Sequence, residues 1–219
     1  MDIFEIIGPV MIGPSSSHTA GAVRLGRIAR MALGEEIKSA NIVLYGSFAR
    51  TGQGHGTDKA IIAGLLGFAC DDTRVRESRE IAAEKGIRVK LSTAVDEDLH
   101  PNTARIQLTG KAGMAIEVLG CSIGGGRVKI TAVNGANVEF TGEYHTLVIN
   151  QKDYPGVVAE VAGVLARNKI NIAYMRVYRN EKHGEAVTVI ESDEAVDEAI
   201  TGELKTLPNI SNVMHITPV

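Results

Sequence analysis

The last third of the chain, residues 145–219, alternates strand-like runs with amphipathic stretches in a fixed order. Apolar residues that alternate with polar ones indicate strands, whereas apolar residues at helical spacing indicate helices. The predicted strands are 145–150, 170–179, 185–192 and 210–219, and the predicted helices lie within 151–169 and 193–205. This order of elements predicts a ferredoxin-like βαββαβ domain over residues 145–219.

Residues 1–143 show a different pattern, which predicts a separate domain of mixed α/β structure. The predicted helices are 19–34, 58–68 and 73–86, and the predicted strands are 39–48, 87–93, 103–110, 114–126, 127–135 and 137–140. The last four strands are separated by Gly or Asn-Gly turns, which is typical of antiparallel hairpins. The net charge of −3 falls entirely after residue 144, which supports a boundary there. The chain is therefore expected to be α+β with two domains.

Composition excludes several classes of partner. A net charge of −3 gives no reason to expect nucleic acid or an anionic membrane surface as a partner. The sequence has no apolar run long enough to span a bilayer and no basic segment of a signal peptide at its start. Its two cysteines, Cys70 and Cys121, are far apart and show no metal-ligand spacing. We therefore expect a cytoplasmic protein without a disulfide framework.

The stretch IGPSSSHTAGA, Ile12 to Ala22, precedes a predicted helix and raises two hypotheses. One serine of Ser15–Ser17 could cap the helix, which contributes about 1 kcal/mol. Alternatively, three hydroxyls and the free N–H groups of a helix start could form a cradle for a carboxylate or phosphate. His18 and Thr19 follow directly, so the imidazole would lie beside a bound anion, where it could act as an acid, a base or a hydrogen-bond donor.

A second motif, RTGQGHGTDKA from Arg50 to Ala60, is predicted to be a glycine-rich loop after a strand. Glycines such as Gly54 allow the backbone to approach a ligand closely, and Thr57 stands near the predicted start of a helix. The spacing does not match a P-loop. Because His55 repeats the arrangement of His18, we expect both motifs to form one composite site.

Other motifs indicate structure rather than function. The run Gly124–Gly126 is typical of a turn or bulge between strands. The acidic run Asp96–Asp98 has no matching His or Cys and is interpreted as a solvated surface. Both cysteines are expected to be packed in the structure or to have no functional role such as metal binding.

The segments IIGPSSSHTAGAVRLG, YGSFARTGQGHGTDKAIIAGLLG, HPNTARI and GCSIGGGRVKI resemble the iron–sulfur-dependent L-serine dehydratases, across nearly the whole chain. That resemblance implies a lyase of amino-acid catabolism and gluconeogenesis, which converts L-serine to pyruvate and ammonia. It also implies that residues 1–143 are similar to the allosteric substrate-binding domain of some phosphoglycerate dehydrogenases. Because this chain lacks cluster-binding cysteines, it looks like a beta chain whose [4Fe–4S] cluster is carried by a separate alpha chain, with no metal ligand of its own.

The same resemblance implies roles for the two motifs. His18 and His55 would handle protons or orient the substrate, although a deprotonated serine hydroxyl as the base stays open. The implied substrate-binding residues are Ser15, Ser16, Ser17, Thr19, Gly54 and Thr57.

The segment LVINQKDYPGVVAEVAGVLARNKINIAYMRV resembles an ACT domain. Two interpretations stay open: the domain binds L-serine as an effector, or it serves only to form a homodimer, for which the N-terminal domain is the other candidate. The candidate effector residues are Asn150, Asp153, Gly156, Val157 and Asn171. An alternative for the whole chain is a regulatory amino-acid sensor without catalysis.

Overall fold

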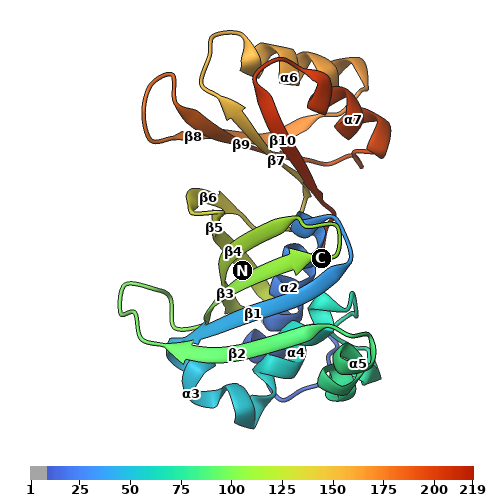
Figure 1. Ribbon diagram of the computed structural model, residues 1–219, viewed down its shortest axis with the longest axis vertical. Coiled ribbons are helices and arrows are strands. Elements are labelled where there is room, and N and C mark those ends of the chain that lie inside the picture. The colour runs from blue at the N-terminus through green and yellow to red at the C-terminus, as the bar shows by residue number, and fades with distance from the viewer. Residues whose placement is uncertain (1–8) are drawn as a thin grey trace. The chain divides into compact units, whose positions relative to one another are not determined.

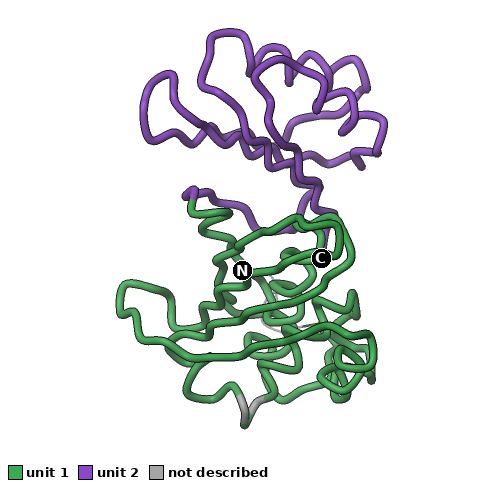
Figure 2. Tube along the Cα trace, in the orientation of Figure 1, with its two compact units in different colours: residues 1–135 green, residues 136–219 purple. Residues whose placement is uncertain are grey.

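The computed structural model describes residues 9–219, except for the side chains of Gln53 and His55. The chain divides into two compact units, one ending at Gly135 and the other beginning at Ala136 (Figure 2). The predicted domain limits at residues 143 and 145 stay a prediction. No helix of the described part of the chain is long and apolar enough to cross a membrane.

The first unit is a twisted sheet with helices (Figure 1). Its strands lie in the order β2-β1-β3-β4-β5, in which β2 runs parallel to β1 and the other neighbours are antiparallel. These strands are β1 (Ile37–Tyr45), β2 (Arg88–Ala94), β3 (Thr103–Gly110), β4 (Ala115–Gly124) and β5 (Arg127–Val133). The helical elements are η1 (Ser17–Gly21), α2 (Ala22–Leu33), α3 (Gly46–His55), α4 (Thr57–Leu65), η2 (Thr73–Glu77) and α5 (Ser78–Glu84).

One face of this sheet is covered and the other is polar. Helix α2 packs on β3 and β4 and also against α4. On the opposite face, Asn41 Nδ2 donates to Gln107 Oε1 at 2.7 Å, and Gln107 Nε2 donates to Glu117 Oε2 at 2.7 Å. A ladder of polar side chains across three strands is typical of a solvated face. The core of the first unit therefore lies between the sheet and α2.

Helices α2 and α4 approach each other through two glycines. A Cβ on Gly26 would lie 2.2 Å from the Ile61 carbonyl oxygen, and a Cβ on Gly64 would lie 2.1 Å from the Val23 carbonyl oxygen. Any side chain at either position would push the helices apart. This close contact fixes α2 relative to α4. Helix α2 begins at the last residue of the first motif, and α4 begins within the second motif.

The predicted glycine-rich loop is wrong, because the chain enters helix α3 directly after β1 ends at Tyr45. The Pro101 carbonyl accepts hydrogen bonds from the N–H groups of Ser47 at 2.6 Å and Phe48 at 3.3 Å. A distant segment thus provides an acceptor for N–H groups that have no partner within the first turn of the helix. Phe48 is fully buried and anchors the helix in the core. Tertiary contacts therefore override the poor helix propensity of glycine. Gly56 ends α3 with a φ of 69°.

From β7 onward, the second unit confirms the predicted βαββαβ order. It consists of β6 (Ala136–Phe140), β7 (His145–Lys152), α6 (Val157–Arg167), β8 (Ile172–Arg179), β9 (Glu185–Ser192), α7 (Glu198–Thr206) and β10 (Ile210–Ile216). Its four-stranded sheet has the order β10-β7-β9-β8, with antiparallel neighbours. Its core joins side chains of the sheet to both helices, including Leu147, Ile149, Val161, Leu165, Ile190 and Leu204. The α+β fold class is confirmed.

Candidate functional site

The three serines of the first motif enter a single π-helical turn, η1. Ser16 adopts helical angles and makes no side-chain cap. Ser15 makes the side-chain hydrogen bond to the turn instead. Its Oγ accepts from the His18 N–H at 3.4 Å and lies 3.4 Å from Ser17 Oγ. The structure thus gives Ser15 a cap-like bond, while the hydroxyls of Ser15 and Ser17 remain neighbours at the start of the turn.

His18 connects the first motif to helix α3. Its Nδ1 lies 3.3 Å from Ser15 Oγ, and its Nε2 lies 3.3 Å from Ser47 Oγ. Its ring packs edge-on against Phe48 with 5.2 Å between ring centroids, and only 9% of the residue is exposed. A buried imidazole between two hydroxyls can hold a proton at one nitrogen while the other accepts one.

Ser47 was not among the predicted site residues. It lies at the start of α3, within the segment predicted to be a strand, so its position depended on an element that the sequence pattern does not indicate. Its backbone N–H donates to the Pro101 carbonyl, which ties it to the HPN segment at His100–Asn102. That segment in turn holds β4, because the Ser122 N–H donates to the Asn102 carbonyl at 3.0 Å.

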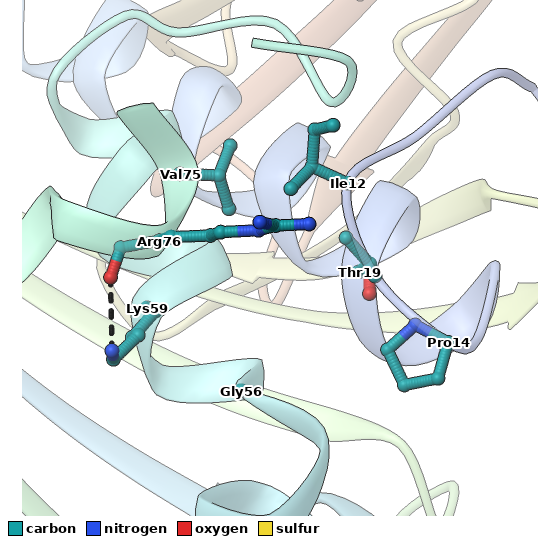
Figure 3. A pocket seen from close by; sticks show the side chains of 8 residues that line it. Ile12, Pro14, Thr19, Gly56, Lys59, Val75 and Arg76 are labelled. Atoms are coloured by element: carbon teal, nitrogen blue, oxygen red, sulfur yellow. Dashed lines mark hydrogen bonds between the residues drawn. The ribbon is translucent and has the colours of Figure 1, made fainter. Parts of the chain in front are cut away.

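A cavity of about 280 Å³ opens beside this arrangement (Figure 3). It brings the two motifs together with a third segment, η2. The residues lining it are Ile12, Gly13, Pro14, Thr19, Gly56, Lys59, Val75 and Arg76. Of the predicted site residues, Thr19 alone lines this cavity, so the composite site stays a prediction.

Two threonine hydroxyls near this cavity lack hydrogen-bond partners among the described residues. Thr19 is 2% exposed and Thr57 is fully buried, and the Oγ1 of each is unpartnered. Thr19 lines the cavity, and Gly13 packs so closely on it that a Cβ there would lie 2.1 Å from Thr19 Oγ1. A buried hydroxyl without a partner is costly, so Thr19 Oγ1 is a ready contact for a polar ligand.

Two cationic side chains at the cavity were also missed by the sequence analysis. Figure 3 shows the Arg76 side chain extended toward Ile12 and Thr19, while Lys59 Nζ donates to the Arg76 carbonyl at 2.9 Å. Arg76 is exposed, and it belongs to η2, a charged segment without a motif. Their positive charges suit an anionic ligand such as a carboxylate.

The remaining residues of the second motif divide into two groups. Gly54 lies within α3, and a Cβ on it would meet no atom within 4 Å. The side chain of His55 lies outside the described residues, so its predicted role stays a prediction. Next to Thr57, the buried Asp58 forms an ion pair with Arg79 at 2.5 Å, which fixes α4 to α5.

The predicted ACT residues lie around the turn between β7 and α6 of the second unit. Asp153 pairs with Arg179 at 2.7 Å and accepts from the His183 N–H, and Arg179 holds the pKa of the Asp153 carboxyl below its usual value. Gly156 has a φ of 97° and is followed by the buried Val157.

The other two predicted ACT residues are tied to neighbouring strands and turns. The Asn150 carbonyl accepts from Ser211 Oγ at 3.2 Å, and the Asn171 N–H donates to Glu194 Oε2 at 2.7 Å.

The cysteines do not fit an iron–sulfur cluster. Cys70 donates to the Val10 carbonyl, whereas Cys121 lies buried in β4, where burial raises the pKa of its thiol. A [4Fe–4S] cluster requires about four thiolate ligands, and the raised pKa of Cys121 disfavours its thiolate form. Among the residues that the structure describes, no three His, Cys, Asp or Glu side chains are grouped to hold a metal ion. The two cysteines of the sequence are fewer than the about four thiolates that such a cluster needs.

Comparisons with known proteins cover both units. The family model of the serine dehydratase beta chain matches residues 1–132, and that of the ACT domain matches residues 145–209. A probable L-serine dehydratase beta chain of Bacillus subtilis is 45% identical over 214 residues, which is 98% of this chain and 97% of that protein. The L-serine dehydratase beta chain of Peptoniphilus asaccharolyticus is 34% identical over 214 residues, which is 97% of this chain and 96% of that protein.

A more distant relative is a longer protein. The D-3-phosphoglycerate dehydrogenase of Bacillus subtilis is 29% identical over 197 residues, which is 89% of this chain but 37% of that protein. The family-model matches and the two beta chains, which are similar along almost their whole length, agree with the predicted resemblance. The chain therefore belongs to the serine dehydratase beta chain family and carries an ACT domain at residues 145–209.

Proposed function

We propose that this chain is the beta chain of a two-chain L-serine dehydratase, which converts L-serine to pyruvate and ammonia. The observation that carries the proposal is His18 between the Ser15 and Ser47 hydroxyls, beside a cavity lined by Thr19, Lys59 and Arg76. Full-length similarity to L-serine dehydratase beta chains supports it.

The cavity offers partners for the carboxylate of L-serine. Arg76 and Lys59 supply positive charge, and the Thr19 hydroxyl can hydrogen-bond to it. Ser15 and Ser17, which precede Thr19 in the first motif, remain proposed contacts of the substrate. His18 holds or accepts a proton at Nε2 or Nδ1. Gly54, Ser16, Thr57 and His55 remain proposed members of the site.

The reaction breaks two bonds of the substrate. Loss of the α-proton and of the 3-hydroxyl as water gives 2-aminoacrylate, whose imine form is hydrolysed to pyruvate and ammonia. When bound on a separate alpha chain, a [4Fe–4S] cluster would supply Lewis acidity for the departing hydroxyl. The part of this chain is to bind the carboxylate, to orient the substrate and to move protons through His18.

The decisive experiment measures pyruvate formation from L-serine by the purified chain, with and without a cysteine-rich alpha chain. We expect no turnover by the chain alone, and turnover together with the visible absorbance of an iron–sulfur cluster in the complex. Replacement of His18 by Ala in the complex should lower kcat by about 100-fold or more. Robust turnover by this chain alone would contradict the proposal.

A further inference from the structure

Strand β2 forms one edge of the sheet in the first unit. Among the described residues it pairs with β1 alone, so the backbone N–H and C=O groups of its outer side face away from the sheet. Such an edge is a template for a further strand unless charges, bulges or a covering element block it.

An apolar groove runs beside this edge. It has a volume of about 430 Å³ and is lined by Ile62, Arg79, Ala83, Ile87, Val89 and Leu91. Val89 and Leu91 lie on the same face of β2, because side chains alternate along a strand. Val95, which follows the strand directly, is 90% exposed. Apolar side chains thus lie on one face of β2 from Val89 to Leu91, and Val95 follows beyond the exposed Thr93. None of the described residues covers Val95.

The charges along β2 change sign from one end to the other. Arg88 and Lys90 are exposed at its beginning, and the exposed acidic run Asp96–Asp98 follows its end. Basic residues on an edge strand usually repel a second strand. A second copy of this segment, aligned antiparallel to the first, would instead bring opposite charges together. The acidic end of each copy would lie against the basic end of the other.

We propose that a second copy of this chain docks antiparallel along β2, so that the sheet continues across a two-fold axis near Ser92. This register places Arg88 opposite Asp96 and Val89 opposite Val95, and each pair occurs twice because the interface is self-complementary. Val95 of each copy then covers the groove of the other. The inference specifies the homodimer, and its tests measure association rather than turnover, so it can fail independently of the proposed reaction.

The first test uses a cysteine on the axis. Residues directly opposite in antiparallel strands have Cα atoms about 4.5–5.5 Å apart, within the range of a disulfide. Ser92→Cys should therefore form a disulfide-linked dimer of the full chain under mild oxidation. Arg88→Cys alone should not, whereas a mixture of Arg88→Cys and Asp96→Cys chains should cross-link. Oxidation of the wild-type chain under the same conditions is the control for cross-linking through Cys70 or Cys121.

The second test reverses the charges. Arg88→Glu or Asp96→Arg should each weaken the dimer by about tenfold, because each change turns two attractive pairs into repulsive ones. The double variant should restore the wild-type dissociation constant, which would assign the loss in the single variants to the charge pairs rather than to misfolding. Lys205→Glu, on the exposed side of α7, is the matched control and should change nothing.

Light scattering over a dilution series gives the dissociation constants. A monomeric purified chain would overturn the inference and leave this edge to a different partner, such as the alpha chain. A dimer that neither cross-links through Ser92→Cys nor responds to Arg88→Glu would overturn it as well, because that dimer would use another surface.

Discussion

The Nε2 atom of His18 lies 3.3 Å from the Oγ of Ser47, which joins the first motif to the start of helix α3. The first prediction concerns this contact. Ser47→Ala should lower kcat of the complex about tenfold and shift its pH profile, because the imidazole loses a group that fixes its orientation and its proton. Ser211→Ala, which removes an exposed hydroxyl of the second unit, should leave both unchanged. Unchanged kcat and pH profile in Ser47→Ala would show that the hydroxyl is structural.

The second prediction concerns Arg76. Arg76→Met should raise the KM for L-serine about tenfold with a smaller effect on kcat, because it removes positive charge that binds the carboxylate in substrate and transition state alike. The KM of Arg76→Lys should lie between those of the wild type and Arg76→Met. The control is Arg74→Met on the same element, since the Arg74 guanidinium pairs with Asp72 and lies over the Phe68 ring. Equal effects of the two methionine variants would argue against carboxylate binding by Arg76.

The third prediction concerns the contact between α2 and α4. Gly26→Ala should lower the free energy of unfolding by about 1–3 kcal/mol, because its Cβ would overlap the Ile61 carbonyl. Gly202→Ala in α7 is the matched control: a Cβ there meets no atom within 4 Å, and alanine is the better helix former, so stability should rise by about 0.5–1 kcal/mol. Urea titration of both variants measures the difference. Equal stability of Gly26→Ala and wild type would refute the close helix contact.

The fourth prediction concerns pH. His145 and His215 stack with 5.8 Å between ring centroids, and burial together with the His145 charge lowers the pKa of His215. Below the ordinary histidine pKa of about 6.5, His215 is therefore protonated in the unfolded chain before it is protonated in the folded chain. The free energy of unfolding should fall as the pH drops below about 6.5, and level off below the folded pKa.

Thermal unfolding of the full chain at about pH 7.5 and about pH 5.5 measures this effect. His215→Gln should lose less stability than the wild type over the same interval, since the titrating group is gone. His183→Gln removes an exposed imidazole of the same unit and should behave like the wild type. A pH response of His215→Gln as large as that of the wild type would assign the effect to other groups.

The elements of the second unit were predictable because each has its own periodicity and its own core face. The run Gly124–Gly126 also forms the predicted turn and bulge, with positive φ at all three glycines. Helix α2 ends at Gly34, which has a φ of 72° and is typical of a helix end. In each of these places, local sequence preference and tertiary structure agree.

The site was only partly predictable, because its parts are assembled by tertiary contacts. The glycines of the second motif suggest a loop, yet Pro101 and the buried Phe48 stabilise a helix there. Arg76 belongs to a segment without a motif, and Lys59 lies in the second motif but was not among its predicted site residues. The packing of η2 beside α4 places both side chains at the cavity. His18 and Thr19 could be predicted from the sequence because a histidine directly after three serines places a titratable ring beside several hydroxyls.

The hydrogen bond from the Ser47 N–H to the Pro101 carbonyl and the contact between Ser47 and His18 also bear on how the protein matures. The arrangement exists only after the chain has closed a loop of about 80 residues, which includes β1, α3, α4 and β2. Contacts of such long sequence separation form late in folding. A nascent or proteolytically nicked chain that has its N-terminal turn and helices therefore still lacks the environment of His18, and activity reports on completed assembly of the first unit rather than on the presence of its motifs.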